Sequence, residues 1–294
     1  MVYQNVAGDP TAMAQDGTPN QPTIPAAMVS RPNGLAMASA STKTVAINGV
    51  NRMEFFSDGP SADIIAGFSS RGPALIGTKL LNEVKPDVVA PGVNVYSSIL
   101  MSSCSSPPCF AFFQGTSMAT PHVAGAAALL KQLHPNWSPL QIKSALVNSA
   151  KRPVGSSSTN SPLMNPMDRG SGRIDLAAAS MITTTIDAHK TTSLGFGQLS
   201  ASMSDILDLP ITALSVTTTT VTYTVAVSPA FASHNSPTVT IDASALTISP
   251  GGTGKVQVTV ATSASTASGD YFGDIVLTGG TVTLSVPYWV EVTP

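Results

Sequence analysis

Residues 115–125 read Gly-Thr-Ser-Met-Ala-Thr-Pro-His-Val-Ala-Gly, and the chain continues from there as an apolar segment to Leu130. The small Gly-Thr-Ser turn precedes a segment that is apolar almost all round, a pattern that predicts a buried helix. Ser117 then lies at the positive end of this helix, where backbone N–H groups have no partner within the helix. Such N–H groups can hold an oxyanion, so the position suits a nucleophile in acyl transfer.

Two further residues of the segment agree with a packed helix. Pro121 follows shortly after the predicted start, where proline is tolerated because the first N–H groups have no intrahelical partner. Gly125 and the alanines around it would let the helix lie close against a neighbouring layer.

The stretch resembles the serine motif of the subtilisin-like serine proteases, or subtilases. Their pattern Gly-Thr-Ser-Met-Ala-x-Pro-His-Val-x-Gly is matched at every defined position of residues 115–125, which is far more specific than a lone Gly-x-Ser. The resemblance implies that Ser117 is the nucleophile and that its own backbone N–H is one donor of the oxyanion hole. The alternative is a serine that caps the helix and carries no chemistry.

Composition narrows the classes of function. The 294 residues suffice for two domains and a sizeable core. Charged residues make up 10% of the chain and the net charge is −2, so a nucleic-acid partner is not expected. The sequence has no uninterrupted apolar run of about eighteen residues, so no membrane span is predicted. The first residues lack the pattern of a signal peptide, although low charge with abundant Thr, Ser and Gly is typical of secreted proteins.

The two cysteines, Cys104 and Cys109, stand close together before the serine motif. Two cysteines without a nearby histidine make a poor zinc site, which needs about four ligands. In an oxidising compartment they are expected to form a local disulfide that pins a loop. Two free thiols in an exposed loop are the alternative, because sequence does not give the geometry.

The first part of the chain predicts a strand over Val2–Val6, a loop to Pro22, a segment over 23–30 and a turn at Asn33–Gly34. This part resembles the second half of a protease-associated domain, an insert that many subtilases carry. We therefore assign residues 1–55 to a partial segment of that kind. The alternative is a short independent β-rich segment, which is too small to bury a core well.

Residues 56–182 resemble the C-terminal part of a subtilase catalytic domain. The segments 67–73 and 85–92 look like those that precede the subtilase serine, with short strand pieces at 88–89 and 93–95. The serine helix should end at Leu133-His134-Pro135. Ser138-Pro139-Leu140-Gln141 is a capping box that opens a helix to Ala150. A loop over 151–168 and a closing helix within 170–179 complete the region.

The rest of the triad has no matching segment. Asp87 is not assigned as the triad acid, because subtilases carry that residue far upstream of the serine; a structural aspartate beside Pro86 is expected instead. His122 lies five residues after Ser117, about 140° around a helix, and so points away from it. The other histidines are expected to be structural or solvated, namely His134, His189 and His234.

Residues 183–294 differ in composition from the preceding part: they are rich in Thr, Val and Ser, and apolar residues alternate with polar ones. Strands are expected at 206–211, 221–227, 238–241, 245–248, 256–260, 271–277 and 281–292, after a linker near 182–190. Seven short strands at this spacing favour an antiparallel β-sandwich. The region resembles the fibronectin-III-like domain that follows many large subtilase catalytic domains.

The sequence therefore predicts an α/β part, the C-terminal portion of a parallel-sheet subtilisin-like domain, followed by an all-β antiparallel sandwich. The resemblance implies a secreted serine endopeptidase acting on protein or peptide substrates. This chain is expected to be inactive alone, because it lacks the triad Asp and His. No cofactor is identifiable, and structural calcium in the parent is left open. The alternative function is an inactive truncated product that serves, if at all, as a binding or structural module.

Overall fold

The computed structural model describes residues 2–3, 28–29, 31–41, 63–76, 79–80, 83–104, 109–151, 155–156, 163–231 and 235–294. These residues form two compact units. The first unit comprises residues 1–69, 91–119 and 155–162, and the second comprises residues 70–90, 120–154 and 163–294. Helix α2 (Thr116–Leu133) begins in the first unit and continues in the second.

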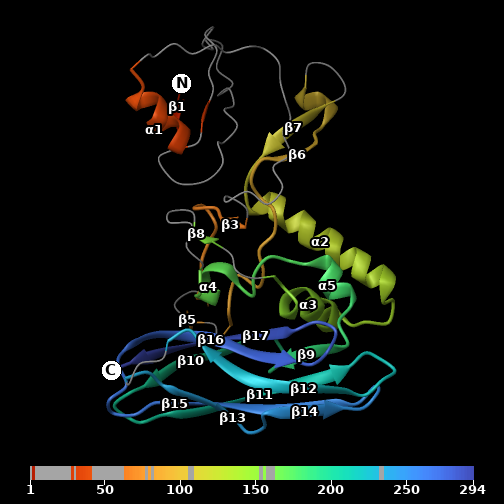
Figure 1. Cartoon of the computed structure of the whole chain (residues 1–294), viewed down its shortest axis with the longest axis vertical. Coiled ribbons are helices and arrows are strands. Elements are labelled where there is room, and N and C mark those ends of the chain that lie inside the picture. Colours follow the sequence, from red (N-terminus) through yellow and green to blue (C-terminus); the bar gives the residue numbers. More distant parts are fainter. Residues whose placement is uncertain are drawn as a thin grey trace. The chain divides into compact units, whose positions relative to one another are not determined.

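The first unit contains short paired strands and one helix besides the start of α2. β1 (Val2–Tyr3) pairs in parallel with β2 (Met28–Val29), and β3 (Ile64–Ile65) pairs in parallel with β8 (Gly155–Ser156). Helix α1 spans Arg31–Ser39. β6 (Val95–Ser98) and β7 (Phe110–Phe113) form an antiparallel hairpin with a 3₁₀ turn, η1 (Met101–Ser103), in its connection (Figure 1).

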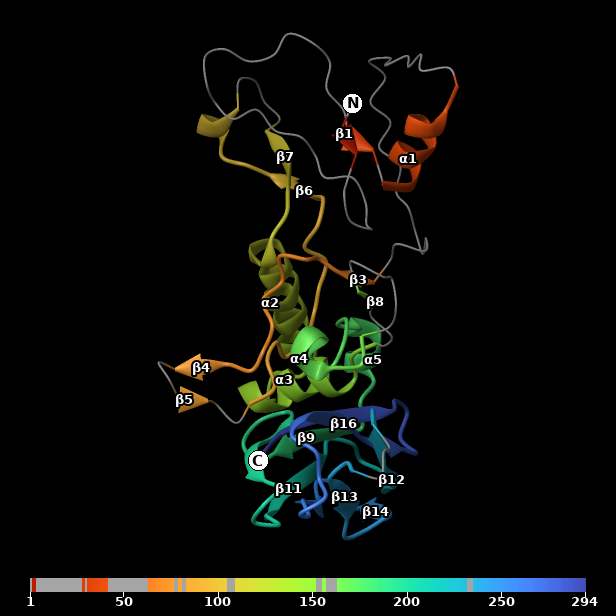
Figure 2. The same ribbon diagram turned by 90° about the vertical axis from the view of Figure 1, so that its left-hand side faces the viewer.

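The second unit carries three further helices and a pair of larger sheets. The helices are α3 (Pro139–Asn148), α4 (Pro166–Arg169) and α5 (Leu176–Ser180). β4 (Leu75–Ile76) and β5 (Lys79–Leu80) form a small antiparallel pair, visible as a separate hairpin in Figure 2. The strands of the sheets are β9 (Thr184–Ala188), β10 (Leu194–Ser200), β11 (Ile206–Ser215), β12 (Val221–Pro229), β13 (Thr238–Ile241), β14 (Ala245–Ile248), β15 (Thr253–Ala261), β16 (Gly269–Thr278) and β17 (Leu284–Thr293).

One sheet has the strand order β10-β17-β16-β12-β14 and the other has the order β13-β15-β11-β9. All neighbours in them are antiparallel except β10 and β17, which pair in parallel. Apolar residues of both sheets and of the helices meet in one core, which includes Leu130, Leu146, Ile186, Tyr223 and Val258. Mixed helices and sheets followed by many antiparallel strands agree with the expected fold class at this level.

Helix α3 connects the helical part of this unit to both sheets. Its capping box is confirmed, since Gln141 N donates to Ser138 Oγ over 3.3 Å and Ser138 N donates to Gln141 Oε1 over 2.8 Å. A buried polar pair follows on the same helix: Ser144 Oγ accepts from Ile186 N at 2.7 Å and donates to Asn148 Oδ1 at 2.9 Å. Because these buried polar atoms are paired, the helix can lie on the sheets without an unsatisfied group.

Several local predictions are corrected by the structure. Asn33–Gly34 is not a turn but lies inside α1, where Pro32 is tolerated in the first turn and the residues after Gly34, Leu35 to Ala38, are good helix formers. The strand predicted over Val2–Val6 is described only at Val2–Tyr3, and its other residues lie outside the described ranges. The α3 helix ends at Asn148 rather than Ala150. The 151–168 loop contains the start of α4, which Asn165 caps through its side chain.

The C-terminal region has nine strands among its described residues, where seven were predicted. The expected linker near 182–190 contains β9, and residues 194–200 form β10. β10 contains two glycines and an irregular register between Gly195 and Gly197, and Gly197 has φ +72°. In the sequence, two glycines so close together indicate a turn rather than a strand. For this reason β10 was not predicted.

We expect residues 183–294 to fold without the rest of the chain, at reduced stability. Most of the core lies between the two sheets, but a fragment of this range loses the contacts of Ser144 and Asn148 with the strands. Thermal unfolding followed by circular dichroism should show one cooperative transition at a lower midpoint than in the full chain. A second fragment that starts at 190 should unfold lower still, because it lacks Ile186 and Ala188, which are fully buried. A non-cooperative transition for 183–294 would contradict an independent domain.

Candidate active site

Ser117 is the second residue of α2 and is exposed. The turn before it is held closed by a hydrogen bond from Gly115 N to Gly92 O, 2.8 Å long. Gly115 has φ +147°, a conformation that side-chain-bearing residues rarely adopt. A Cβ at Gly92 would lie 2.9 Å from Gly115 O, so both glycines are needed where the two segments touch. The close packing fixes the direction in which the helix leaves the turn.

The electrostatics of this turn favour a negative charge near Ser117. The first N–H groups of a helix have no partner within it, and the helix dipole places partial positive charge there. The first turn of α2 carries no acidic residue that would oppose an anion. The position can therefore stabilise an oxyanion that forms beside the Ser117 side chain.

Pro121 lies further into the helix than was predicted. As the sixth residue of α2 it stands beyond the first turn, so an N–H at this position would have donated to the carbonyl of Ser117. Proline has no N–H, and the helix nevertheless continues to Leu133. The backbone around Ser117 therefore has one intrahelical bond fewer than a regular helix.

The prediction that this helix is buried all round is wrong for the described structure. Of its residues only Ala126 and Leu130 are buried, while Leu129 and Leu133 are more than half exposed. No heavy atom beyond its own local backbone lies within 4 Å of a Cβ built at Gly125, so the close approach expected there is absent from the described residues. One stripe of the helix faces the core, and the remaining apolar surface is open.

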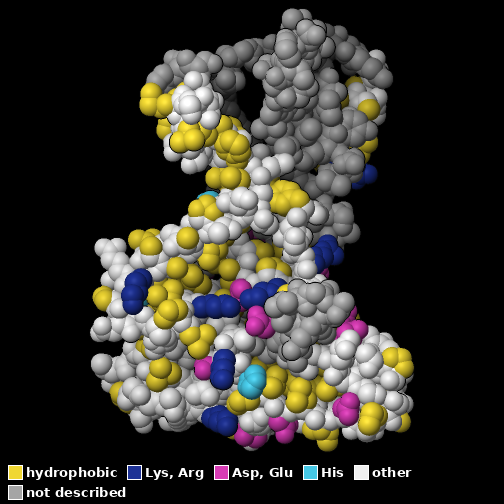
Figure 3. Space-filling view, turned by 180° about the vertical axis from the view of Figure 1, so that it is seen from behind, with side chains coloured by type: hydrophobic (Ala, Val, Ile, Leu, Met, Phe, Trp, Pro, Cys, Tyr) yellow, Lys and Arg dark blue, Asp and Glu magenta, His cyan; other side chains and the backbone are white. Residues whose placement is uncertain are grey.

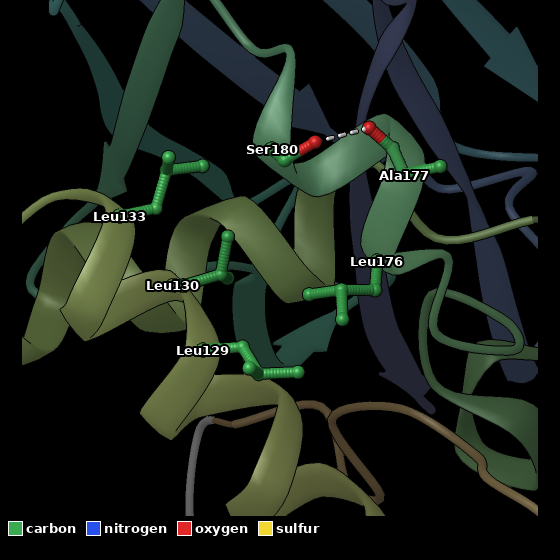
Figure 4. A pocket seen from close by; sticks show the side chains of 6 residues that line it. All are labelled: Leu129, Leu130, Leu133, Leu176, Ala177 and Ser180. Atoms are coloured by element: carbon green, nitrogen blue, oxygen red, sulfur yellow. Dashed lines mark hydrogen bonds between the residues drawn. The ribbon is translucent and has the colours of Figure 1, made fainter.

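A pocket of about 370 Å³ lies between this open surface of α2 and α5. It is lined by Leu129, Leu130, Leu133, Leu176, Ala177 and Ser180 (Figure 4). Its only hydroxyl, that of Ser180, donates to Ala177 O at 2.8 Å. The pocket is therefore apolar and offers no group for proton transfer.

The described histidines have the following surroundings. His122 is exposed, five residues along α2 from Ser117. The ring of His134 stacks on Trp137 with centroids 3.7 Å apart, at the end of the helix where it was predicted to stop. His189 has φ +57° in the turn between β9 and β10. His234 lies outside the described residues. The stacking gives His134 a structural role, one of the two alternatives expected from the sequence.

Asp87 is tied into an ion-pair network. Its carboxylate lies 2.9 Å from Lys85 Nζ and 2.8 Å from Lys143 Nζ, and its carbonyl accepts from Ser171 N at 3.0 Å. Burial acts to raise the pKa of Asp87, but hydrogen bonds and charge from Lys143 and Lys85 outweigh it and hold that pKa below its ordinary value. Burial likewise acts to lower the pKa of Lys85, and Asp87 and Glu83 outweigh it, so that pKa is raised. This environment agrees with the structural role predicted for Asp87.

We expect Asp87→Asn to destabilise the fold in a pH-dependent manner. The folded pKa of Asp87 lies below the unfolded one, so its stabilisation is present above about pH 4 and disappears as the pH falls through the folded pKa. The variant should lose about 1 kcal/mol at pH 7, and its deficit should shrink toward pH 3. Urea unfolding at both pH values measures this. Lys143→Gln serves as the partner control and should show the same trend; an equal deficit at both pH values would contradict the linkage.

Cys104 and Cys109 form a disulfide with Cα atoms 5.8 Å apart, which confirms the expected pairing. It closes the connection between β6 and β7, the strands that lead to the serine turn. Ile99 N donates to Cys109 O at 3.0 Å, so the pairing continues beyond the two strands. The disulfide therefore holds the hairpin at its tip.

The described residues hold no group of three or more His, Cys, Asp or Glu side chains arranged to bind a metal ion. Among the same residues, no helix is both long and apolar enough to span a bilayer.

Comparison with known proteins identifies the family. A profile described as the subtilase family matches residues 20–197, more than half of the chain. The chain belongs to the subtilase family.

Similar proteins include subtilisin-like proteases of Arabidopsis thaliana. Subtilisin-like protease SBT3.9 is 44% identical over 117 residues, which is 38% of this chain and 15% of that protein. Subtilisin-like protease SBT1.3 is 43% identical over 125 residues, 38% of this chain and 16% of that protein. The chain therefore spans only a small part of these relatives. Among solved structures, a family 123 glycoside hydrolase from Clostridium perfringens is 14% identical with a TM-score of 0.30, covering 38% of this chain and 27% of that one.

Proposed function

We propose that this chain carries the nucleophile of a secreted, multidomain subtilisin-like serine endopeptidase. The observation that supports this most is Ser117 itself, exposed on the second residue of a helix, inside a motif matched throughout 115–125 in a chain of the subtilase family. The substrates would be proteins or peptides, and no cofactor is required for this chemistry. The disulfide Cys104–Cys109 supports a secreted protein, because such bonds persist in oxidising compartments.

In the proposed reaction, Ser117 Oγ attacks the carbonyl carbon of the cleaved bond while a base takes the hydroxyl proton. The backbone N–H of Ser117 donates to the oxyanion that forms. The C–N bond then breaks, the amine leaves with the proton from the base, and water releases the acyl group from Ser117. The base, its orienting aspartate and a further oxyanion donor would come from a segment that matches nothing in this sequence.

The proposed domain organisation follows the sequence resemblance. Residues 1–55 would be part of a protease-associated domain, residues 56–182 the C-terminal part of the catalytic domain, and residues 183–294 a fibronectin-III-like sandwich. Two sheets that share one core support the last assignment. This domain organisation does not by itself establish an activity, because the function depends on the residues of the site around Ser117.

A fluorophosphonate probe tests the proposal, because it reacts only with an activated serine. We expect no labelling of the 294-residue chain alone, and labelling of Ser117 when an upstream segment with the subtilase Asp and His motifs is supplied. Ser117→Ala should abolish that labelling. Ser138→Ala is the matched control, since Ser138 is also an exposed serine at a helix N-terminus, and it should retain labelling. Strong Ser117-dependent labelling of the chain alone would show that one of its own histidines is the base.

A further inference from the structure

One side of the β-sandwich ends in two short strands without charged residues. Among the described residues, β14 (Ala245–Ile248) pairs only with β12, and β13 (Thr238–Ile241) pairs only with β15. Residues 242–244 connect these two strands directly, so both lie on the same side of the sandwich. Neither strand contains Asp, Glu, Lys or Arg, and most of the surface over the sheets in Figure 3 is uncharged. We call β13 and β14 the open edge.

The outermost strands at the opposite side, β9 and β10, are covered by helix α3. Ser144 Oγ accepts from Ile186 N on β9 at 2.7 Å, and Asn148 Nδ2 donates to Thr192 O, between β9 and β10, at 2.9 Å. In Figures 1 and 2, β13 and β14 lie on the side of the sheets that faces away from α3 and α5. The N–H and C=O groups of an outermost strand can pair with a further strand, and proteins normally cover or charge such an edge. In the described part of the chain, no helix covers the open edge as α3 covers β9.

The pairing of β14 with β12 determines which of its backbone groups point outward. Val225 N donates to Ser244 O at 2.8 Å, so these two residues form a hydrogen-bonded pair. Hydrogen-bonded and non-hydrogen-bonded pairs alternate along an antiparallel ladder. Leu246 therefore bonds to β12, whereas the N–H and C=O groups of Ala245 and Thr247 point away from β12. These outward groups are the ones that a further strand would pair with.

The spacing of these outward groups is self-complementary. If a two-fold axis passes beside Leu246, Ala245 of each copy lies opposite Thr247 of the other copy, and both positions become hydrogen-bonded pairs. The same axis keeps the faces of the sheet matched. Leu246 is buried and stays on the core face, while Ala245 and Thr247 are exposed and stay on the solvent face. Two five-stranded sheets then join into one continuous sheet.

We propose that the open edge is a self-association surface, through which two copies of this chain pair β14 against β14 in antiparallel orientation. The absence of charge from both strands removes the like-charge repulsion that opposes contact between identical surfaces. Four residues of strand are about 14 Å long and stacked sheets lie about 10 Å apart, so each copy buries only a few hundred Å². Stable dimers bury more, so this dimer is weak and reversible. The inference does not depend on Ser117.

Cysteine cross-linking of the full chain tests the register. The Cα atoms of a hydrogen-bonded antiparallel pair lie about 5.5 Å apart, within the range of a disulfide. A mixture of the Ala245→Cys and Thr247→Cys variants should therefore form a disulfide-linked dimer with one chain of each kind, which mass spectrometry identifies. Either variant alone should cross-link at least about tenfold less, because identical positions are offset by two residues along the strands. The native Cys104 and Cys109 are already paired with each other.

Sedimentation velocity at roughly 100 µM protein measures the dimer itself. Ala245→Lys should weaken it at least about tenfold, because lysine on an outermost strand opposes pairing. Thr224→Lys is the matched control and should leave the dimer unchanged: Thr224 is also exposed and lies opposite Ala245, one strand further in. Ala245→Pro provides a second test, since it removes only an outward N–H at the first residue of the strand.

Circular dichroism checks that each variant keeps the fold. A chain that remains monomeric at this concentration would overturn the proposal. So would equal effects of the two lysine substitutions, or cross-linking of each cysteine variant alone as efficiently as of the mixture, because the pairing would then not follow the register of β14.

Discussion

Replacing Arg169 with methionine is expected to lower the free energy of unfolding by about 3–5 kcal/mol, the cost of breaking a buried charged network. The Arg169 side chain is almost fully buried, and its guanidinium donates to three carbonyl oxygens: Leu163 O at 2.7 Å, Gly170 O at 2.7 Å and Met164 O at 3.0 Å. Methionine fills much of the same volume but leaves those carbonyls without this donor.

The variant also removes the cation beside a buried acid. Arg169 Nη2 lies 3.7 Å from Asp274 Oδ2 on β16. Asp274 in turn lies close to Tyr288. The pKa of the Tyr288 phenol is raised, mainly because the phenol is buried and also because of the negative charge of Asp274. Without Arg169 the Asp274 carboxylate has lost a compensating charge in a poorly hydrated place.

Arg71→Met is the matched control for this prediction. Arg71 Nε lies 3.0 Å from Asp168 Oδ1, a shorter ion pair, but its side chain is 68% exposed. We expect it to change stability by less than about 1 kcal/mol, as exposed pairs do. Urea unfolding of both variants provides the comparison. Equal losses for Arg71→Met and Arg169→Met would show that burial does not set the cost.

The second large effect is expected from Gly170→Ala. Gly170 has φ +60° and ψ −139°, a combination that is nearly restricted to glycine. A Cβ there would lie 2.3 Å from Asp87 O and 2.5 Å from Pro86 O. Those are backbone atoms, and the Asp87 segment is held by the ion pair with Lys143 and by the hydrogen bond from Ser171 N to Asp87 O. The segment therefore cannot move aside, and we expect a loss of about 4 kcal/mol, in the range of exceptional single substitutions.

Gly251→Ala separates the steric effect from the backbone conformation. Gly251 has φ +65°, but a Cβ built there meets no atom within 4 Å. It should cost only the conformational term, about 1 kcal/mol. The difference between the two variants, measured by chemical unfolding, then reports the contact with the Asp87 segment. Similar losses at both glycines would mean that the segment yields.

The structural features that the sequence predicts best are those that depend on residues close together in the chain. The capping box of α3, the end of α2 before Pro135 and the alternating strands of the C-terminal region depend on side chains a few positions apart, so the sequence carries them directly. Ser117 is placed at the start of α2 for the same reason, because the small turn and the helix are adjacent in the chain. The structure agrees with each of these.

The features that escaped prediction depend on contacts between distant segments. Arg169 looks like part of a polar loop in the sequence, and only the folding of 163–170 around its guanidinium gives it a structural role. The contact of Gly92 with Gly115 is similar: the Pro91-Gly92 pair suggests a turn, but not the segment against which that turn closes. The burial of α2 was overestimated because apolar composition alone does not show which neighbours a helix has in this chain.

The amide of Asn148 has a consequence for the order in which the molecule can assemble. Its Nδ2 donates to Thr192 O and to Ser285 O, both at 2.9 Å, and these acceptors lie 44 and 137 residues later in the chain. Contacts across such separations close large loops and form late. During synthesis from the N-terminus, α3 emerges long before β17, so its buried amide has no Ser285 acceptor until β17 follows. The packing of α3 against the sheets is therefore completed only after β17 has emerged from the ribosome.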